Sequence, residues 1–274
     1  MGDKSELRYA VLLIKQEFLR PPEIAHVLAA VRKVPFHDVI PAAKSSWGII
    51  AGDLEKKAAQ ELAGLLSGSD LGALAIPRTL IEDLPPARKA AELGLGPDGL
   101  HVPRDTGGTE RVAKERLALI AASGFKEAEL KKEKGERYPS AGHAEVGFGL
   151  AAVTGLPIGP GRRKREPAKP PASSELVFYF DLFLKNPSER LRIDAQRFDF
   201  SCLKARMAYN VLGNLRRLIE SMVRIAPAAR QNRGAKVIAE KRPLREMGYE
   251  TPADLDRECR WLLTLDSLGL PADS

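Results

Sequence analysis

The sequence predicts a mixed α+β protein in two parts, and three observations lead to this fold class. Aliphatic runs alternate with segments of helical periodicity in residues 1–83. Short runs of strand character, separated by turn residues, fill the middle of the chain. A continuous apolar stripe at helical spacing then occupies residues 204–226. The chain has 274 residues, of which 44% are hydrophobic and 29% charged, so wholesale disorder is excluded.

The N-terminal part, residues 1–83, is expected to form a single small domain. Proline at the first turn of a helix costs nothing, because the missing N–H would have no partner there, so Pro21-Pro22 predicts a helix start. The expected elements are a strand at 8–15, a helix from Pro21 to Pro35, strands at 37–44 and 46–51, a helix from Asp53 to Gly68, and a strand at 71–77. This βαββαβ order resembles the ferredoxin-like unit.

The C-terminal part, residues 87–274, is expected to be β-rich and closed by a long amphipathic helix. Two Gly-containing turns, at 96–99 and 105–108, predict a β-meander over 88–121. Further strands are expected at 175–184, 190–195 and 197–200, then the helix at 204–226, and a last helix capped by Thr251 with Asp254 three residues later. Strands followed by one long helix resemble, in element order only, a pleckstrin-homology-like (PH-like) barrel.

A segment rich in charge, glycine and proline interrupts this part at 123–174. Five prolines fall between Pro157 and Pro171, and four consecutive basic residues occupy 162–165. A stretch of this length without strand or helix periodicity predicts a flexible basic insertion rather than part of the core.

The charge of the chain is uneven. The formal net charge is +7, yet residues 202–245 alone hold eleven basic and two acidic residues. A basic stripe would bind phosphates with counterion release, or an anionic membrane surface by the same attraction. Its candidate anion contacts are Arg206, Arg217, Arg224, Arg230 and Arg233. The alternative is internal pairing with the acidic tail that follows, through Glu250, Asp254, Asp256 and Glu258.

No assembled catalytic motif is readable in the sequence. The Gly-rich segment 154–164 does not match a phosphate-binding P-loop. The histidines are isolated, and Cys202 and Cys259 cannot make a complete zinc site, so we expect no metal and no cofactor. Arg20 lies where acylphosphatase-like sites hold phosphate, but no asparagine follows in 37–51. A dispersed site that gathers His37, Asp38 or Cys202 stays open as an enzyme alternative.

Two aromatic residues, Tyr9 and Trp47, are expected on the strands of the N-terminal sheet. RNA-recognition modules stack bases on such residues, but their RNP sequence pattern is missing, so Tyr9 and Trp47 are candidate sheet-face contacts for a partner. We therefore expect a non-catalytic binding or regulatory adaptor that holds a protein partner, with nucleic-acid binding through 202–245 as the alternative.

The cellular setting is inferred from three further features. Neither a secretory signal nor an apolar run of roughly 20 residues is present, and there are only two cysteines. These features predict a cytoplasmic protein without a transmembrane segment.

Overall fold

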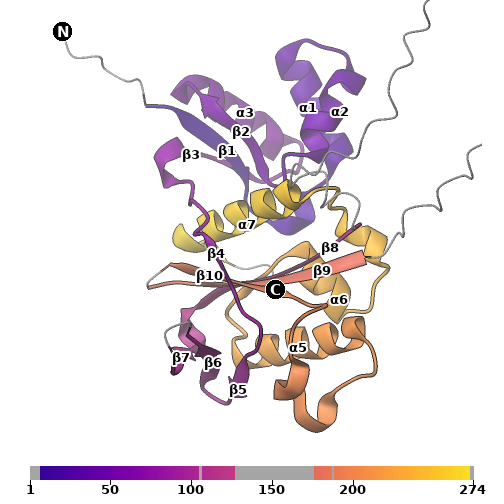
Figure 1. Cartoon of the computed structure of the whole chain (residues 1–274). Helices are drawn as coiled ribbons and strands as arrows, with labels where there is room; N and C mark the ends of the chain where they lie inside the picture. Colours follow the sequence, from indigo (N-terminus) through magenta and orange to yellow (C-terminus); the bar gives the residue numbers. More distant parts are fainter. Residues whose placement is uncertain (1–6, 105–106, 127–175, 187, 272–274) are drawn as a thin grey trace, which may run out of the picture. The chain divides into compact units, whose positions relative to one another are not determined.

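Figure 1 shows the computed structural model of the chain, which describes residues 7–104, 107–126, 176–186 and 188–271. The described residues combine helices with several β-sheets, so the predicted α+β class is confirmed. The described residues up to Phe125 and from Val177 onward form one compact unit. Most of the predicted insertion at 123–174, including its basic run at 162–165, lies outside the described residues.

The N-terminal elements form a small sheet with helices between its strands. The sheet has the order β2-β1-β3, and both neighbours run antiparallel to the central strand β1. Residues Ala10–Leu13 of β1 are completely buried, as the aliphatic run predicts. The elements are β1 (Tyr9–Leu13), α1 (Pro21–Arg32), α2 (Phe36–Lys44), β2 (Ile49–Leu54), α3 (Lys56–Gly68) and β3 (Ala73–Pro77).

The strand predicted at 37–44 is wrong, because these residues form α2. Pro35 precedes the helix, and the buried residues Val39 and Ala43 lie four positions apart on its inner face. Nine residues are too few for periodicity to decide between a strand and a helix. The observed order is therefore strand, two helices, strand, helix, strand, with one strand fewer than a βαββαβ unit has. Asp53 belongs to β2, and Glu55 precedes α3.

The C-terminal part contains two sheets. The larger sheet is mixed and has the order β11-β8-β9-β10-β4, with β9 and β10 antiparallel and the outer pairs β11–β8 and β10–β4 parallel. The smaller sheet, β5-β6-β7, is an antiparallel meander. The strands are β4 (Ala87–Lys89), β5 (Gly94–Gly96), β6 (Gly99–Pro103), β7 (Thr109–Ala113), β8 (Leu117–Lys126), β9 (Leu176–Leu184), β10 (Glu189–Asp194) and β11 (Arg230–Gln231).

Several predicted strands of this part are present. The turn at 96–99 joins β5 to β6, and Gly99 is required there because its φ is +148° and a Cβ would lie 2.0 Å from the Val112 carbonyl oxygen. The strands expected at 175–184 and 190–195 appear as β9 and β10. The strand expected at 197–200 is absent, because Asp199 accepts a hydrogen bond from the Ser201 N–H and starts a 3-10 helix, η4 (Phe200–Arg206).

Three longer helices complete the unit, namely α5 (Val211–Ile225), α6 (Arg233–Ala239) and α7 (Pro252–Ser267). The predicted apolar stripe of α5 is buried, with Leu215, Leu218 and Ile219 at 0% exposure. α5 begins at Val211 rather than 204, because the Asn210 side chain accepts a hydrogen bond from the Gly213 N–H and caps the helix. The predicted cap of α7 is confirmed, since Thr251 and Asp254 form a capping box.

Helix α7 contacts both the N-terminal sheet and the larger C-terminal sheet (Figure 1). The Trp261 indole N–H donates to the Leu13 carbonyl at 2.7 Å, and Asp256 accepts from Arg190 of β10, also at 2.7 Å. These contacts lie within the compact unit formed by the described residues up to Phe125 and from Val177 onward. Within the described ranges, no helix has the length and apolar character to cross a membrane.

Candidate binding site at Trp47

Trp47 lies in the turn between α2 and β2, and not on a strand as predicted. Its φ is +46°, and Gly48 follows with a φ of +90°, so the chain reverses tightly here. A side chain at Gly48 would collide with the Trp261 ring, because its Cβ would lie 2.0 Å from that ring. The close approach of α7 thus fixes the position of the Trp47 backbone.

The Trp47 ring is held from two sides. Its indole N–H donates to Asp254 Oδ1 at 3.0 Å, and its ring stacks on Tyr249 with centroids 4.8 Å apart. Trp47 is only 5% exposed. Tyr9, the other aromatic residue predicted on the sheet face, is half-buried in β1 between Leu54 and Pro77. Among the described residues, Tyr9 and Trp47 make no ring contact, so they do not form one aromatic surface.

A pocket of about 760 Å³ opens beside Trp47. Helix α2 and the start of α1 supply an apolar wall, while Arg233 of α6 and the loop before α7 face it. The apolar wall consists of Leu19, Pro21, Ile40, Pro41, Ala42 and Ala43. The sequence reasoning missed this wall because it assigned residues 37–44 to a strand.

Two cations line the pocket without a carboxylate partner. The Arg233 guanidinium lies 5.7 Å from the centroid of the Trp47 ring, a cation–π distance, and Lys44 is exposed at the end of α2. No carboxylate in the described part of the chain forms an ion pair with either side chain. Two carboxylates, Glu250 and Asp254, also line the pocket, and Asp254 already accepts hydrogen bonds from Trp47, from the Thr251 N–H and from Arg257.

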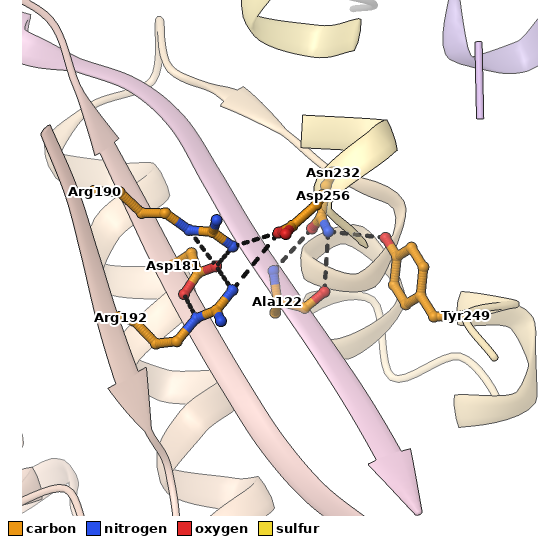
Figure 2. A network of polar contacts seen from close by, with 7 residues as sticks. All are labelled: Ala122, Asp181, Arg190, Arg192, Asn232, Tyr249 and Asp256. Atoms are coloured by element: carbon orange, nitrogen blue, oxygen red, sulfur yellow. Dashed lines mark hydrogen bonds and ion pairs between the residues drawn. The ribbon is translucent and has the colours of Figure 1, made fainter. Parts of the chain in front are cut away.

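A buried polar cluster supports the pocket from behind. Tyr249 donates from its hydroxyl to Glu258, which also accepts the Arg233 N–H at 3.0 Å. Burial raises the pKa of the Glu258 carboxyl above its usual value, although the Tyr249 and Arg233 contacts act in the opposite direction. Burial likewise raises the pKa of the Tyr249 phenol. Asn232 joins this cluster to β8, because its amide bonds both the N–H and the C=O of Ala122 (Figure 2).

A second buried polar cluster ties α7 to the larger sheet, as Figure 2 shows. Asp181 is completely buried and accepts hydrogen bonds from Arg190 and Arg192, its neighbours across the β9–β10 pair. Asp256 of α7 accepts from Arg190 at 2.7 Å. Burial lowers the pKa of the Arg192 guanidinium, but its bonds to Asp181 outweigh this and hold the pKa above its usual value. The charged groups of this cluster are paired with one another, so we infer that the cluster stabilises the fold and does not bind a ligand.

The five arginines predicted as anion contacts do not form one stripe. Arg230 is buried and donates to the Leu270 and Pro271 carbonyls. It also lies 3.8 Å from Asp266, so part of the acidic tail does meet the basic segment. Arg233 belongs to the Trp47 pocket.

The remaining three arginines lie together on α5 and the segment before it. Arg217 and Arg224 are seven residues apart on α5, and Arg206 donates to Ser221 between them at 2.9 Å. The tail carboxylates named as their partners lie elsewhere, since Asp254 and Glu258 contact the Trp47 region and Asp256 contacts β10.

The titratable residues of the enzyme alternative lie on different elements. His37 and Asp38 are exposed on α2, whereas Cys202 is half-buried in η4. Burial raises the pKa of the Cys202 thiol, and of the Cys259 thiol well above its usual value, which disfavours the reactive thiolate in both. The described residues contain no group of three or more His, Cys, Asp or Glu side chains placed to hold a metal ion.

Comparisons with known protein families, with curated proteins and with solved structures found no match for this chain.

Proposed function

We propose that the chain is a non-catalytic binding protein that holds a short peptide segment of a protein partner in the Trp47 pocket. The observation that carries this proposal is the pairing of an apolar wall with unpaired cations in one open pocket. Its volume of about 760 Å³ is enough for one or two large side chains. An adaptor role and a cytoplasmic location are part of the same proposal, and so is the resemblance of residues 87–274 to a PH-like domain.

The chemistry of the pocket specifies the partner segment. The wall formed by Ile40 and its neighbours favours an aliphatic or aromatic side chain. Arg233 and Lys44 favour a carboxylate next to it, because neither side chain forms an ion pair among the described residues, although Glu258 lies near Arg233 behind the pocket. The charge of Asp254 is offset by Arg257 at 3.3 Å, which lowers its repulsion of a second acid, and the other pocket carboxylate, Glu250, is exposed to solvent. The expected ligand is a peptide with a large apolar residue beside Asp, Glu or a C-terminal carboxylate.

A second pocket, of about 380 Å³, is a weaker candidate. It contains Arg88 and Arg104, but Glu110 lies 3.7 Å from Arg88 and 3.2 Å from Arg104, and Glu189 lies 3.7 Å from Arg88. These cations are already neutralised, so the pocket offers little to an incoming anion.

Selection from a displayed library of random peptides on the purified protein tests the proposal. We expect selected peptides to share an apolar residue next to an acidic one and to bind in solution. Ile40→Asp, which places a charge on the apolar wall, should abolish binding, and Arg233→Gln should weaken it about tenfold, the cost of one charge-assisted contact. Leu65→Asp is the matched control, because Leu65 is exposed on α3 and does not line the pocket.

Two results would refute the peptide proposal. The first is a selection that yields no shared sequence. The second is a set of binding peptides whose affinity is the same for the Ile40→Asp variant and for the unchanged protein.

A further inference from the structure

A second surface with a different chemistry runs from the segment before α5 along that helix to Arg224. It consists of Arg206, Met207, Tyr209, Arg217 and Arg224, and we call it the Tyr209 surface. The Tyr209 side chain is fully exposed and Met207 is half-exposed, although both are large apolar groups. An isolated exposed side chain needs no explanation, but Tyr209 lies three residues after Arg206, whose side chain lies on α5 beside Ser221.

The cations of the Tyr209 surface lie along two turns of α5, from Arg217 to Arg224, with Arg206 packed between them. Arg206 donates to Ser221 at 2.9 Å, and Arg217 donates to the Arg206 carbonyl. Arg224 is exposed one turn further along. Glu220, 3.6 Å from Arg206, is the one carboxylate that the described residues place in an ion pair with these three arginines. The surface therefore keeps a net positive charge.

The backbone that presents Tyr209 is strained. Lys204, five residues earlier, has a φ of 50° and a ψ of −130°, a conformation that residues other than glycine rarely adopt. Such strain persists only where the surrounding structure enforces it, and it gathers at functional segments. Here it kinks η4 two residues before the element ends at Arg206, and Met207 and Tyr209 follow directly.

We propose that the Tyr209 surface binds single-stranded nucleic acid. The arginines contact successive phosphates, and the Tyr209 ring stacks on an unpaired base. Base pairs in a duplex are stacked on each other and offer no free face to the ring, so a single strand is favoured over a duplex. This site is separate from the Trp47 pocket in both residues and ligand chemistry.

An anionic membrane surface fits this site less well. A helix that lies on a membrane inserts its apolar face, but the apolar face of α5 is buried in the protein core, with Leu215, Leu218 and Ile219 at 0% exposure. A membrane would then have only charge attraction and the Met207 and Tyr209 side chains to bind.

Fluorescence anisotropy with labelled oligonucleotides tests the proposal on the full chain. The probes are a single-stranded RNA and a single-stranded DNA of mixed sequence, a duplex, and vesicles containing phosphatidylserine. We expect single strands to bind more tightly than the duplex or the vesicles. Three phosphate contacts give a slope of about −2 in log affinity against log salt, a loss of about 40-fold between about 0.05 and 0.3 M salt.

Substitutions separate stacking from charge. Tyr209→Ala should weaken single-strand binding about tenfold, and Tyr209→Phe should preserve it, because the ring is retained. Arg217→Ser together with Arg224→Ser should reduce the salt slope to about −0.7. The matched control removes the same charge from α3, by Lys56→Ser with Lys57→Ser. Arg230 is left unchanged because it is buried, and its loss would disturb folding.

Three results would overturn this proposal. One is the absence of single-strand binding at low salt. Another is equal affinity of the unchanged protein and Tyr209→Ala. The third is binding of the duplex or the vesicles as tightly as the single strands.

Discussion

Replacing Asp181 with asparagine removes the charge on which two arginines converge. Asp181 is completely buried, and Arg190, which donates to it at 3.0 Å through Nε, is 5% exposed. Asparagine has nearly the same size, but it presents an N–H₂ donor or a neutral oxygen to the guanidinium groups. Arg190 would then keep only Asp256, whose side chain is 44% exposed and therefore screened by solvent.

The magnitude follows from burial. Breaking a buried ion pair on one side costs about 3–5 kcal/mol, because a buried charge is left uncompensated. Arg192 adds little to this cost, since its side chain is 27% exposed and can turn toward water. We therefore expect Asp181→Asn to lower the free energy of unfolding by about 4 kcal/mol.

Urea unfolding followed by tryptophan fluorescence measures this loss. With a denaturant slope of about 2–3 kcal/mol per molar, the midpoint should fall by roughly 1.5 M. The control is Arg78→Ala, which breaks an Arg78–Asp53 pair of 3.3 Å whose side chains are 60% and 66% exposed, and which should cost less than about 1 kcal/mol. The double variant Asp181→Leu with Arg190→Met should recover part of the loss, since it removes both charges. Equal midpoints for Asp181→Asn and Arg78→Ala would refute the reasoning.

Two further predictions concern the cluster behind Trp47. Asn232→Ala should lower the free energy of unfolding by about 3 kcal/mol, because it leaves the buried N–H and C=O of Ala122 without their side-chain partner; a loss below about 1 kcal/mol in urea unfolding would contradict this. Glu258 has a raised pKa in the folded state, so the folded protein binds more protons than the unfolded chain, and stability falls as pH rises from the usual value of 4.5 through the raised one. Glu258→Gln should remove this part of the pH dependence, as melting temperatures of both proteins across that range would show; identical pH profiles would contradict it.

Local sequence signals were sufficient for several elements. The aliphatic runs predicted β1 and β9, because a buried strand needs apolar residues on both faces. Proline at the first turn and the Thr251–Asp254 capping box predicted the starts of α1 and α7, since these effects act within four residues. The buried stripe of α5 was also readable, because its periodicity extends over four turns.

Tertiary contacts decided the remaining features. Residues 37–44 carry β-branched side chains, yet they form α2, because burial of Val39 and Ala43 outweighs a weak local preference. The sequence also did not show which basic residues are buried. Arg224 and Arg230 lie in the same charged stretch, but only Arg230 is buried, because it packs against the chain at the end of α7.

The sequence by itself determined which segments are helical or extended wherever caps, prolines and apolar periodicity within one segment decide this. It also determined the excess of positive charge in 202–245. The tertiary structure alone decided the Trp47 pocket and the Asp181 cluster. Trp47 and Asp254 are 207 positions apart, and Arg190 and Asp256 are 66 apart. Contacts at such separations depend on how sheets and helices pack, and no pattern within one segment encodes that packing.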